Sequence, residues 1–269
     1  MKNKNQYSKE HLQYLNGVRK KNLLINVVRF SILLLLLFVW ELSARFEWIN
    51  PFITSSPSRI VKTIADLYKN GTLFYHVGTT LGETLLGFFI AVALGYSIAL
   101  LLWWSEAFRR ISEPYFVVLN ALPKIALGPL IIIWCGTGSK AIVFITVLIG
   151  LIVAILNMLN GFMATDENKL LLLQSMGATK LQILTKLVIP SSLPAFISML
   201  KINVGMAWIG SIMGEYIVSK AGIGYLIVYG GQVFKLDLVM SSVFILCILA
   251  AAMYAIVSLV ERLVIKNRK

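Results

Sequence analysis

Long apolar segments alternate with short polar segments along most of this chain of 269 residues. The stretch from Ser31 to Trp40, for example, is almost entirely Leu, Ile, Val and Phe. A helix of about 20 apolar residues crosses the hydrocarbon core of a bilayer. We predict six such spans, at residues 23–42, 83–104, 114–134, 141–163, 195–218 and 238–260. The pattern therefore predicts an all-α, polytopic membrane protein with six transmembrane helices.

The remaining segments divide the chain into an arm, a membrane domain and a tail. Residues 1–22 form a polar, basic N-terminal arm, and residues 261–269 form a basic tail. No small-residue cleavage site follows the first apolar run, so we expect a retained span rather than a removed signal peptide. Within the membrane domain, residues 23–260, an amphipathic stretch at residues 58–68 predicts a short helix on the outer surface.

The distribution of Lys and Arg predicts the orientation of these segments. If both termini lie inside the cell, the inner segments hold sixteen Lys and Arg residues and the outer segments hold seven. In this count Arg109-Arg110 marks a short inner turn, and Lys124 and Lys201 stay unassigned because they lie within spans. Inner loops of membrane proteins carry the excess of basic residues. We therefore expect a multi-pass protein of the cell membrane with a cytoplasmic arm and a cytoplasmic tail.

The third predicted span contains features that are unusual inside a membrane. A lysine at the centre of a span costs about 2.5–3.5 kcal/mol, and Lys124 lies there. Pro123 and Pro129 interrupt the helical hydrogen bonds on either side, which favours a bent segment beside a cavity. Two interpretations stay open: Lys124 reaches a membrane interface, or it faces a watery path.

The fifth predicted span carries Glu215, its only acidic residue. A carboxylate is costly in lipid, so Glu215 should face the helix bundle or the outer interface, where Lys220 could pair with it. Asn203 in the same span could line a path, but an asparagine there more often joins neighbouring helices. Both residues are candidates for a translocation path.

The segment of residues 165–194 between the fourth and fifth spans is too polar to lie in lipid. Thr165, followed by two acidic residues, predicts a helix start, and Gly177 predicts its end. Thr179 opens a second helix in which Gln182 completes a capping box and Pro190 ends the helix. Its apolar face is predicted to comprise Leu181, Leu184, Leu187 and Val188. The product is a helical hairpin outside the membrane, and its plainest role is a linker that packs on its own protein.

Composition narrows the range of functions. The chain is 58% hydrophobic and 14% charged, with a mean hydropathy of +0.81, whereas a soluble domain carries about 25% charged residues. The net charge of +13 reflects basic residues at the ends of spans and does not require a nucleic-acid partner. The cysteines, Cys135 and Cys247, and the histidines, His11 and His76, form no metal-binding pattern, and both histidines are expected to be solvated.

Three sequence blocks resemble one family. In the hairpin, Gly177, nine further residues and Leu-Val-Ile-Pro190 are similar to the "EAA" loop of ABC-importer permeases, and Ser-Ser-Leu-Pro194 resembles its extension in sulfonate, taurine and nitrate permeases. This chain departs at residues 171–173, where three leucines replace Glu-Ala-Ala. The third-span sequence from Pro114 to Gly136 resembles the same permeases, with Cys135 where an aromatic residue is more usual. So does Gly-Glu215-Tyr followed by Gly-Ile-Gly at residues 222–224.

The resemblance implies the permease subunit of an ABC importer with a type I permease fold. It implies a small solute, such as a sulfonate, taurine, nitrate or a thiamine precursor, delivered by an extracytoplasmic binding protein. It also implies a separate ATPase subunit and a second copy of the chain. ATP and Mg²⁺ would bind to the ATPase, because this sequence has no phosphate-binding loop. The residues implied to couple the ATPase are Gly177, Ala178, Thr179, Lys180, Pro190 and Pro194. Those assigned to the path are Pro123, Lys124, Asn203 and Glu215.

Two other classes of protein are less consistent with the sequence. A secondary transporter driven by an ion gradient predicts inverted repeats and ionisable relays within the membrane. The sequence shows no internal repeat and few charges inside its spans. An intramembrane enzyme predicts a His, Ser or Asp constellation at the middle of the spans, and the sequence has none.

Overall fold

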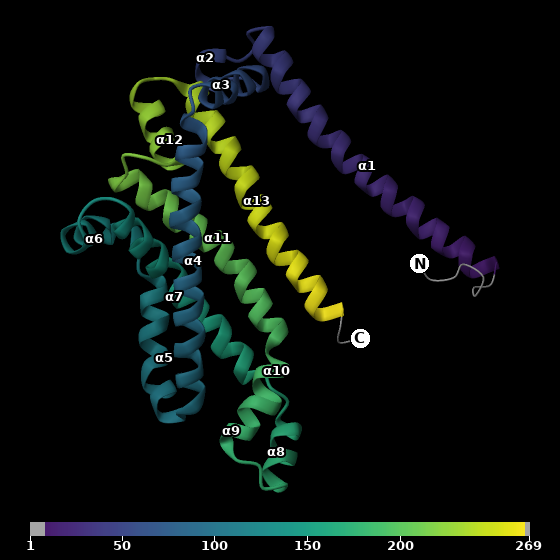
Figure 1. Cartoon of the computed structure of the whole chain (residues 1–269). Coiled ribbons are helices and arrows are strands. Elements are labelled where there is room, and N and C mark those ends of the chain that lie inside the picture. The colour runs from purple at the N-terminus through teal and green to yellow at the C-terminus, as the bar shows by residue number, and fades with distance from the viewer. Residues whose placement is uncertain (1–8, 267–269) are drawn as a thin grey trace.

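The structure, a computed structural model, describes residues 9–266, and these residues form helices and short connections without a strand (Figure 1). The first half contains α1 (Lys9–Arg45), α2 (Pro51–Thr54), α3 (Pro57–Lys69), α4 (Thr72–Trp104), α5 (Glu106–Ala121), a 3-10 helix (Lys124–Leu127) and α6 (Gly128–Cys135). The second half contains α7 (Ser139–Met163), α8 (Glu167–Ser175), α9 (Lys180–Ile183), a π-helix (Leu184–Val188), α10 (Ile189–Ser191), α11 (Leu193–Val218), α12 (Ile223–Gln232) and α13 (Leu236–Lys266).

Five of these helices are long and apolar enough to cross a membrane, and the bent pair α5–α6 makes a sixth span if its two helices are taken as one. The five segments are Leu23–Arg45, Thr72–Trp104, Ser139–Met163, Leu193–Val218 and Leu236–Val264. The prediction of an all-α membrane protein is confirmed. Most predicted spans fall within longer helices than expected; α4, for example, is continuous from Thr72 rather than beginning at Glu83.

The third span differs from the prediction of a single segment between Pro114 and Trp134. Its first half, α5, begins at Glu106, and the two halves are bent by 85° at the break before Lys124. Arg109 and Arg110 therefore lie inside a helix rather than in a turn. Each pairs with an acid four residues away in the sequence, an arrangement that supports a helix. Because proline cannot continue the hydrogen-bond ladder, the bend follows Ala121 and precedes the short 3-10 helix.

Helix α7 lies at the centre of the bundle. It makes its most extensive contacts with α11 and α4, and 56% of its most apolar stretch is buried, the largest fraction among the spans. Small residues permit the close approach. A Cβ on Gly95 would overlap Ala154, and one on Gly210 would lie 2.6 Å from the Thr146 backbone. Small residues replace bulky apolar ones at such contacts because membrane helices associate through close van der Waals packing.

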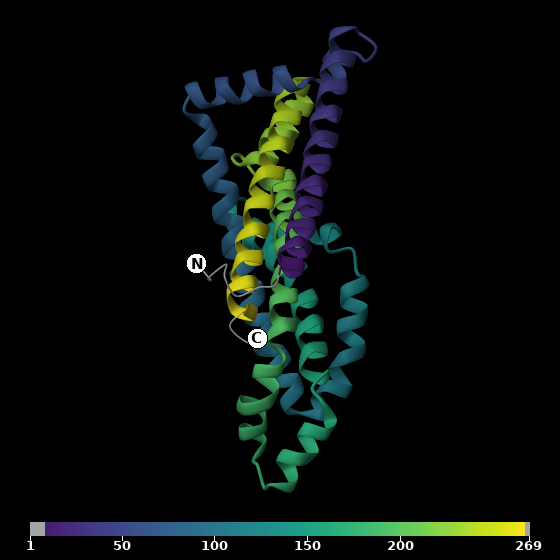
Figure 2. The same cartoon turned by 90° about the vertical axis from the view of Figure 1, so that its right-hand side faces the viewer.

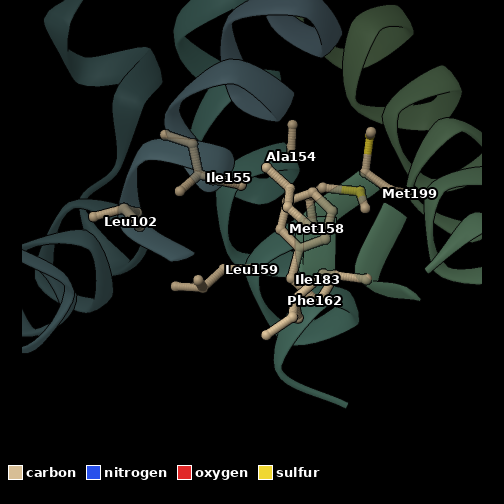
Figure 3. Packing of buried hydrophobic residues seen from close by; sticks show 11 residues of the cluster. Leu102, Ala154, Ile155, Met158, Leu159, Phe162, Ile183 and Met199 are labelled. Carbon is tan, nitrogen blue, oxygen red and sulfur yellow. The ribbon is translucent and has the colours of Figure 1, made fainter. Parts of the chain in front are cut away.

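The largest buried apolar cluster lies where α4, α7 and α11 meet the segment that follows α9 (Figure 3). Leu102 of α4 and Met158 and Phe162 of α7 are almost fully buried there. Ile183 joins them from the end of α9 (Figure 3). One end of the bundle is therefore packed directly onto residues 183–188, outside the predicted spans.

Helix α1 stands apart from the bundle. None of its apolar stretch is buried, whereas its C-terminal end contacts α2 and α3 (Figure 1). Its clearest polar link is a hydrogen bond of 3.0 Å from the Ser58 N–H to Glu41. In Figure 2 this helix overlaps α13, but Figure 1 shows that the two helices are far apart. The bundle of α4, α7 and α11 is thus complete without α1.

The amphipathic helix predicted at residues 58–68 is α3, Pro57–Lys69. Ser56 caps its N-terminus by accepting a hydrogen bond from the Arg59 N–H, and Pro57 occupies the first turn. Ile60 is buried, and Arg59 forms an ion pair of 2.8 Å with Asp237 at the start of α13. The helix therefore lies across the end of the bundle opposite α8 and α9 (Figure 1).

Candidate functional site

Two groups of residues at opposite ends of the bundle stand out. At one end, the hairpin of residues 165–194 projects beyond the long helices (Figures 1 and 2). At the other end, buried polar side chains of α4 and α11 hold the start of α12. The residues predicted from the sequence divide between these ends and the bent span.

The hairpin begins one residue later than predicted. Asp166, not Thr165, caps α8, because its carboxylate accepts the Asn168 N–H at 2.9 Å. Thr165 is buried, and its hydroxyl donates to the Phe162 carbonyl at the end of α7. Thr165 thus forms a hydrogen bond at the C-terminal end of α7, and Asp166 supplies the negative charge that the N-terminus of α8 favours.

The turn of the hairpin follows the prediction. Gly177 has a φ of +77°. Its N–H donates to the Gln174 carbonyl, and the Ala178 N–H donates to the Leu173 carbonyl, both at 2.9 Å. These two bonds are those of a Schellman motif, in which glycine ends a helix. The capping box is also present, since the Thr179 hydroxyl accepts the Gln182 N–H and the Gln182 side chain accepts the Thr179 N–H.

The prediction that Pro190 ends the second helix is wrong. A π-helix over Leu184–Val188 carries the chain on through α10 to Ser191. The Ile189 N–H bonds to the Leu184 carbonyl, five residues back. A proline ring clashes with the carbonyl four residues before it, and a wider turn relieves that clash. The helical path therefore bends at Pro190 instead of stopping there.

The hairpin presents two different apolar surfaces. Leu184 and Val188 are buried against α4 and α7, but Leu181, which was predicted to share their face, is 59% exposed. The wider π turn rotates the later residues relative to α9. Around Gly177, four large apolar side chains project outward and form what we call the apolar tip: Leu171, Leu172, Met176 and Leu181. An exposed apolar group on a segment outside the membrane indicates a protein contact.

Lys180 joins the hairpin to the bundle. Its ammonium group donates to the Trp104 carbonyl at the end of α4, at 2.5 Å, and lies 5.5 Å and 5.8 Å from the rings of Trp104 and Trp103. A cation is favourable at a helix C-terminus and over an aromatic face. Lys180 therefore connects the start of α9 to the C-terminal end of α4.

The bent span places Pro123 and Lys124 at its break. Pro123 is exposed, and Lys124 is half-buried, with its ammonium group 3.2 Å from the Asn120 carbonyl. Lysine here satisfies a carbonyl that the break leaves free. The position at the end of α5, rather than in the middle of a straight helix, also explains how a lysine is tolerated.

Asn203 and Glu215 lie inside the bundle, each with 1% exposure. Asn203 donates to the Met199 carbonyl of its own helix, and its amide oxygen faces Gly150 of α7. Either residue would reach a path only after neighbouring helices move. The alternative of a pair between Glu215 and Lys220 is wrong: Lys220 is exposed and takes part in none of the ion pairs found within residues 9–266.

Glu215 instead belongs to a group that the sequence analysis missed. Three successive backbone N–H groups at the start of α12 donate to side chains of other helices. Gly222 donates to His76 at 3.1 Å, Ile223 to Thr80 at 2.8 Å and Gly224 to Glu215 at 2.5 Å. We call these three side chains the loop clamp. His76 is therefore half-buried and hydrogen-bonded rather than solvated.

Glu83 completes this polar group. It is 5% exposed, and its carboxyl group lies within hydrogen-bonding reach of Glu215 and of Ser139 at the start of α7. The sequence did carry a signal, because Glu83 is an acid within an apolar helix and His76, Thr80 and Glu83 recur at helical spacing. Nothing in the sequence indicates that Glu83 lies next to Glu215 inside the bundle, because the two residues are 132 positions apart.

The glycines of the Gly-Ile-Gly sequence make room for this group. Gly222 has a φ of +107°, and a Cβ there would overlap the Glu215 carboxyl group. A Cβ on Gly224 would lie 2.8 Å from the same carboxyl oxygen. Gly214, beside Glu215, packs against the Ile142 backbone. The block of Gly-Glu and Gly-x-Gly is therefore one packing unit formed by α7, α11 and the start of α12.

The fold and the hairpin together define a membrane-embedded transport subunit. Residues 85–269 match the family described as "binding-protein-dependent transport system inner membrane component". The chain belongs to this family, so it is the permease subunit of an ABC importer and a multi-pass protein of the cell membrane.

Individual relatives agree with this assignment. The chain is 32% identical to the formylaminopyrimidine transport permease protein ThiX of Halalkalibacterium halodurans, over 88% of this chain and 94% of the relative. It is 25% identical to the taurine transport system permease protein TauC of Escherichia coli, over 81% of each chain.

Solved structures share the fold. An inward-facing MetNI methionine ABC transporter has a TM-score of 0.64 at 18% identity, covering 70% of this chain and 94% of that chain. A bacterial ABC transporter involved in import of the polysaccharide alginate has a TM-score of 0.63 at 13% identity, covering 93% and 98%. The expected type I permease fold is confirmed.

Proposed function

We propose that two copies of this chain form the membrane pathway of an importer that is driven by ATP hydrolysis on separate subunits. ATP and Mg²⁺ bind to those ATPase subunits, and a binding protein outside the membrane delivers the solute. The observation that carries the proposal is the hairpin, which combines an apolar tip with a rigid connection to the bundle. The orientation of the chain, the second copy and the path residues are assigned relative to this hairpin.

The hairpin lies on the cytoplasmic side in this proposal. Its end of the bundle holds most of the Lys and Arg residues when both termini are placed inside the cell, as the positive-inside rule requires. The opposite end, with α2, α3 and α12, then faces outward. A cysteine tag at either end of the chain should react with an impermeant reagent only after the inner face is opened, and reaction in intact cells would contradict this orientation.

The hairpin is the contact with the ATPase. Met176 is 74% exposed and Leu172 is 59% exposed, although neither lies in a predicted span. Contact with a partner would remove this apolar surface from water, which stabilises a complex by about 25 cal/mol for each Å² buried. Gly177, Ala178 and Thr179 set the turn, Lys180 transmits its movement to α4, and Pro190 and Pro194 direct the chain back into the bundle.

A second copy supplies the rest of the pathway. Helix α1 has no buried apolar stretch, and α13 has 6% of its own buried, so both present long faces that a single copy leaves uncovered. Each copy also contributes one bent span with Pro123 and Lys124 at the break. We assign these two residues to the path, and Asn203 and Glu215 to positions that would join it when α7 and α11 separate.

The solute is a small molecule or ion. The relative with the greatest identity of those named above is described as a formylaminopyrimidine permease, which favours a thiamine-precursor-like compound. Taurine, sulfonates and nitrate are the alternatives. Uptake of each labelled compound, with the binding protein encoded beside this chain, would decide between them.

The assembly itself can be tested without knowing the solute. The tagged chain should purify with an ATPase encoded nearby, and native mass measurement should give two permeases with two ATPases. The complex should hydrolyse ATP, and the isolated chain should not. Purification of the intact chain without any ATPase, or hydrolysis by the chain alone, would contradict the proposal.

A further inference from the structure

The buried carboxyl group of Glu83 has no assigned role in the family description or in the proposed function, and the contact between Glu83 and Glu215 has none either. The two carboxyl groups lie between three elements, α4, α7 and α11, directly beneath the start of α12. We propose that this carboxyl pair shares one proton and that the proton fixes the loop clamp, so that α12 is held as part of the bundle.

The hydrogen bonding of the two carboxyl groups requires a proton. The two carboxyl groups lie within hydrogen-bonding reach of each other. One oxygen of each, Glu83 Oε2 and Glu215 Oε1, is buried with no hydrogen-bond partner within residues 9–266. Ionised carboxylates only accept hydrogen bonds, so a bond between two of them requires a proton. A single proton between the two carboxyl groups meets this requirement.

The charges around the pair also favour a single proton. His76 of α4 accepts the Gly222 N–H beside Glu215, which requires an unprotonated ring nitrogen, so no charged imidazole balances the pair there. Neither carboxyl group takes part in an ion pair found in the described part of the chain. Two adjacent buried carboxylates without a cation repel each other strongly, whereas one proton leaves a single negative charge.

The position of that proton follows from the contact with α12. Glu215 accepts the Gly224 N–H in the first turn of α12, where the helix dipole favours a negative charge. This contact favours the negative charge on Glu215, which leaves the proton on Glu83. The three hydrogen bonds that hold the start of α12 come from His76, Thr80 and Glu215 and not from Glu83. It is a positioning residue that acts through Glu215.

The consequence is mechanical. His76 and Thr80 of α4 and Glu215 of α11 hold three N–H groups that the first turn of any helix leaves without partners. Because the clamp spans two helices, α12 stays attached only while α4 and α11 keep their relative position. The loop is thus coupled to the packing of the bundle rather than being a free surface segment.

The proton can be detected directly in the purified chain. At mildly alkaline pH, the infrared spectrum should show the carbonyl stretching band of a protonated carboxyl group, and Glu83→Gln should remove it. The matched control is Glu261→Gln, which removes a carboxylate paired with Lys201 at 2.5 Å and should leave the band unchanged. A native spectrum without the band, or a band that survives Glu83→Gln, would overturn the shared proton.

The clamp can be tested with a buried thiol reporter. Leu226→Cys, in a chain with both native cysteines replaced by serine, places a thiol on a side chain of α12 that is 6% exposed. An exposed comparator, Gln232→Cys on the same helix, corrects for intrinsic reactivity. In the reporter chain, Glu83→Gln should keep the thiol protected, because a glutamine amide also donates to Glu215.

Removing the donor should release α12. Glu83→Ala should raise the corrected labelling rate by roughly tenfold or more, the change expected on losing a hydrogen bond to a buried charge. Thr80→Val, which keeps the side-chain shape but removes the acceptor of the Ile223 N–H, should also raise it and serves if the alanine variant fails to fold. If the thiol at position 226 were labelled as slowly in both variants as in the chain with native Glu83 and Thr80, the proposed role of the loop clamp would be wrong. Equal exposure in Glu83→Gln and Glu83→Ala would overturn the role of the donor. These readouts do not depend on import or on an ATPase.

Discussion

The two ends of the bundle differ in how far apart in the sequence their hydrogen-bonded residues lie. At the hairpin, the bonds that form the turn join residues three to five positions apart, as between Ala178 and Leu173. At the loop clamp, Ile223 and Thr80 are 143 positions apart, and Gly222 and His76 are 146 positions apart. The first end is shaped by its own sequence, and the second exists only when distant helices have packed.

This difference separates the roles of the two ends. The hairpin turn keeps its shape through caps and glycine conformation, while Lys180, Ile183 and Leu184 connect the hairpin to the bundle. The clamp ties α12 to α4 and α11, so it moves only with the bundle. A change in either end should therefore leave the other intact, and the following predictions test that independence from the largest expected effect to the smallest.

The largest effect is expected for Gly177→Val. Valine in the left-handed conformation adds strain of roughly 1–3 kcal/mol, enough to misplace the hairpin turn without unfolding the spans. The variant should reach normal abundance but lose co-purifying ATPase and uptake, while the Leu226→Cys reporter stays protected. Gly205→Ala is the control, because Gly205 has no positive φ and nothing within 4 Å of an added Cβ. Full uptake and normal ATPase recovery in Gly177→Val would disprove the coupling role of the hairpin.

A charge within the apolar tip should have the next largest effect. Burying a leucine side chain contributes about 1.5–3 kcal/mol, so Leu172→Asp should reduce ATPase recovery by roughly tenfold or more. Gln174→Asp, at an exposed polar position of the same helix, should change recovery little. Because leucines occupy residues 171–173, recovery of the native complex should also resist high salt, which screens exposed charge pairs. Loss of the native complex in high salt would show that ion pairs dominate the contact.

A smaller effect is expected within the bundle itself. The Thr84 hydroxyl donates to Ser211 at 2.7 Å and joins α4 to α11 at a fully buried position. Thr84→Val should lower the free energy of unfolding by about 1 kcal/mol and reduce the melting temperature in detergent. In the control, Thr79→Val, the hydroxyl that is removed bonds within α4, so the melting temperature should change less. Equal shifts in the two variants would argue against an interhelical contribution.

The smallest effect is expected for Arg59→Gln. The pair between Arg59 and Asp237 joins α3 to α13 at a distance of 2.8 Å, but its side chains are 42% and 28% exposed. Exposed pairs contribute about 0–1 kcal/mol and are screened by salt. The variant should melt slightly below the native chain at low salt and together with it at high salt. A large shift that persists in high salt would show that Arg59 acts through packing instead.

Much of the hairpin could be predicted because its signals are local. Gly177 and the capping box of Thr179 and Gln182 adopt the predicted conformations, since glycine freedom and short-range side-chain bonds operate within a few residues. The errors also have local causes. Asp166 competes successfully with Thr165 as the cap, and the π turn before Pro190 turns Leu181 away from the buried face.

The bent span shows where sequence patterns lose information. Pro123 and Pro129 indicated a break, and hydropathy indicated one span, but neither gives the bend of 85° between α5 and α6. Proline removes a hydrogen bond and permits many directions for the chain that follows. Contacts of α6 and the 3-10 helix with α7 select the direction.

The sequence by itself determined the helical state of the apolar spans and the shape of the hairpin turn, because apolar length, caps and glycine act within single segments of the chain. Only the tertiary structure decided that Glu83 faces Glu215, that His76 and Thr80 hold α12, and that Glu215 is not paired with Lys220. Each of these contacts joins residues from different helices. Their meeting depends on how α4, α7 and α11 pack, and close packing of helices follows from small residues and side-chain shapes that no single segment of the sequence contains.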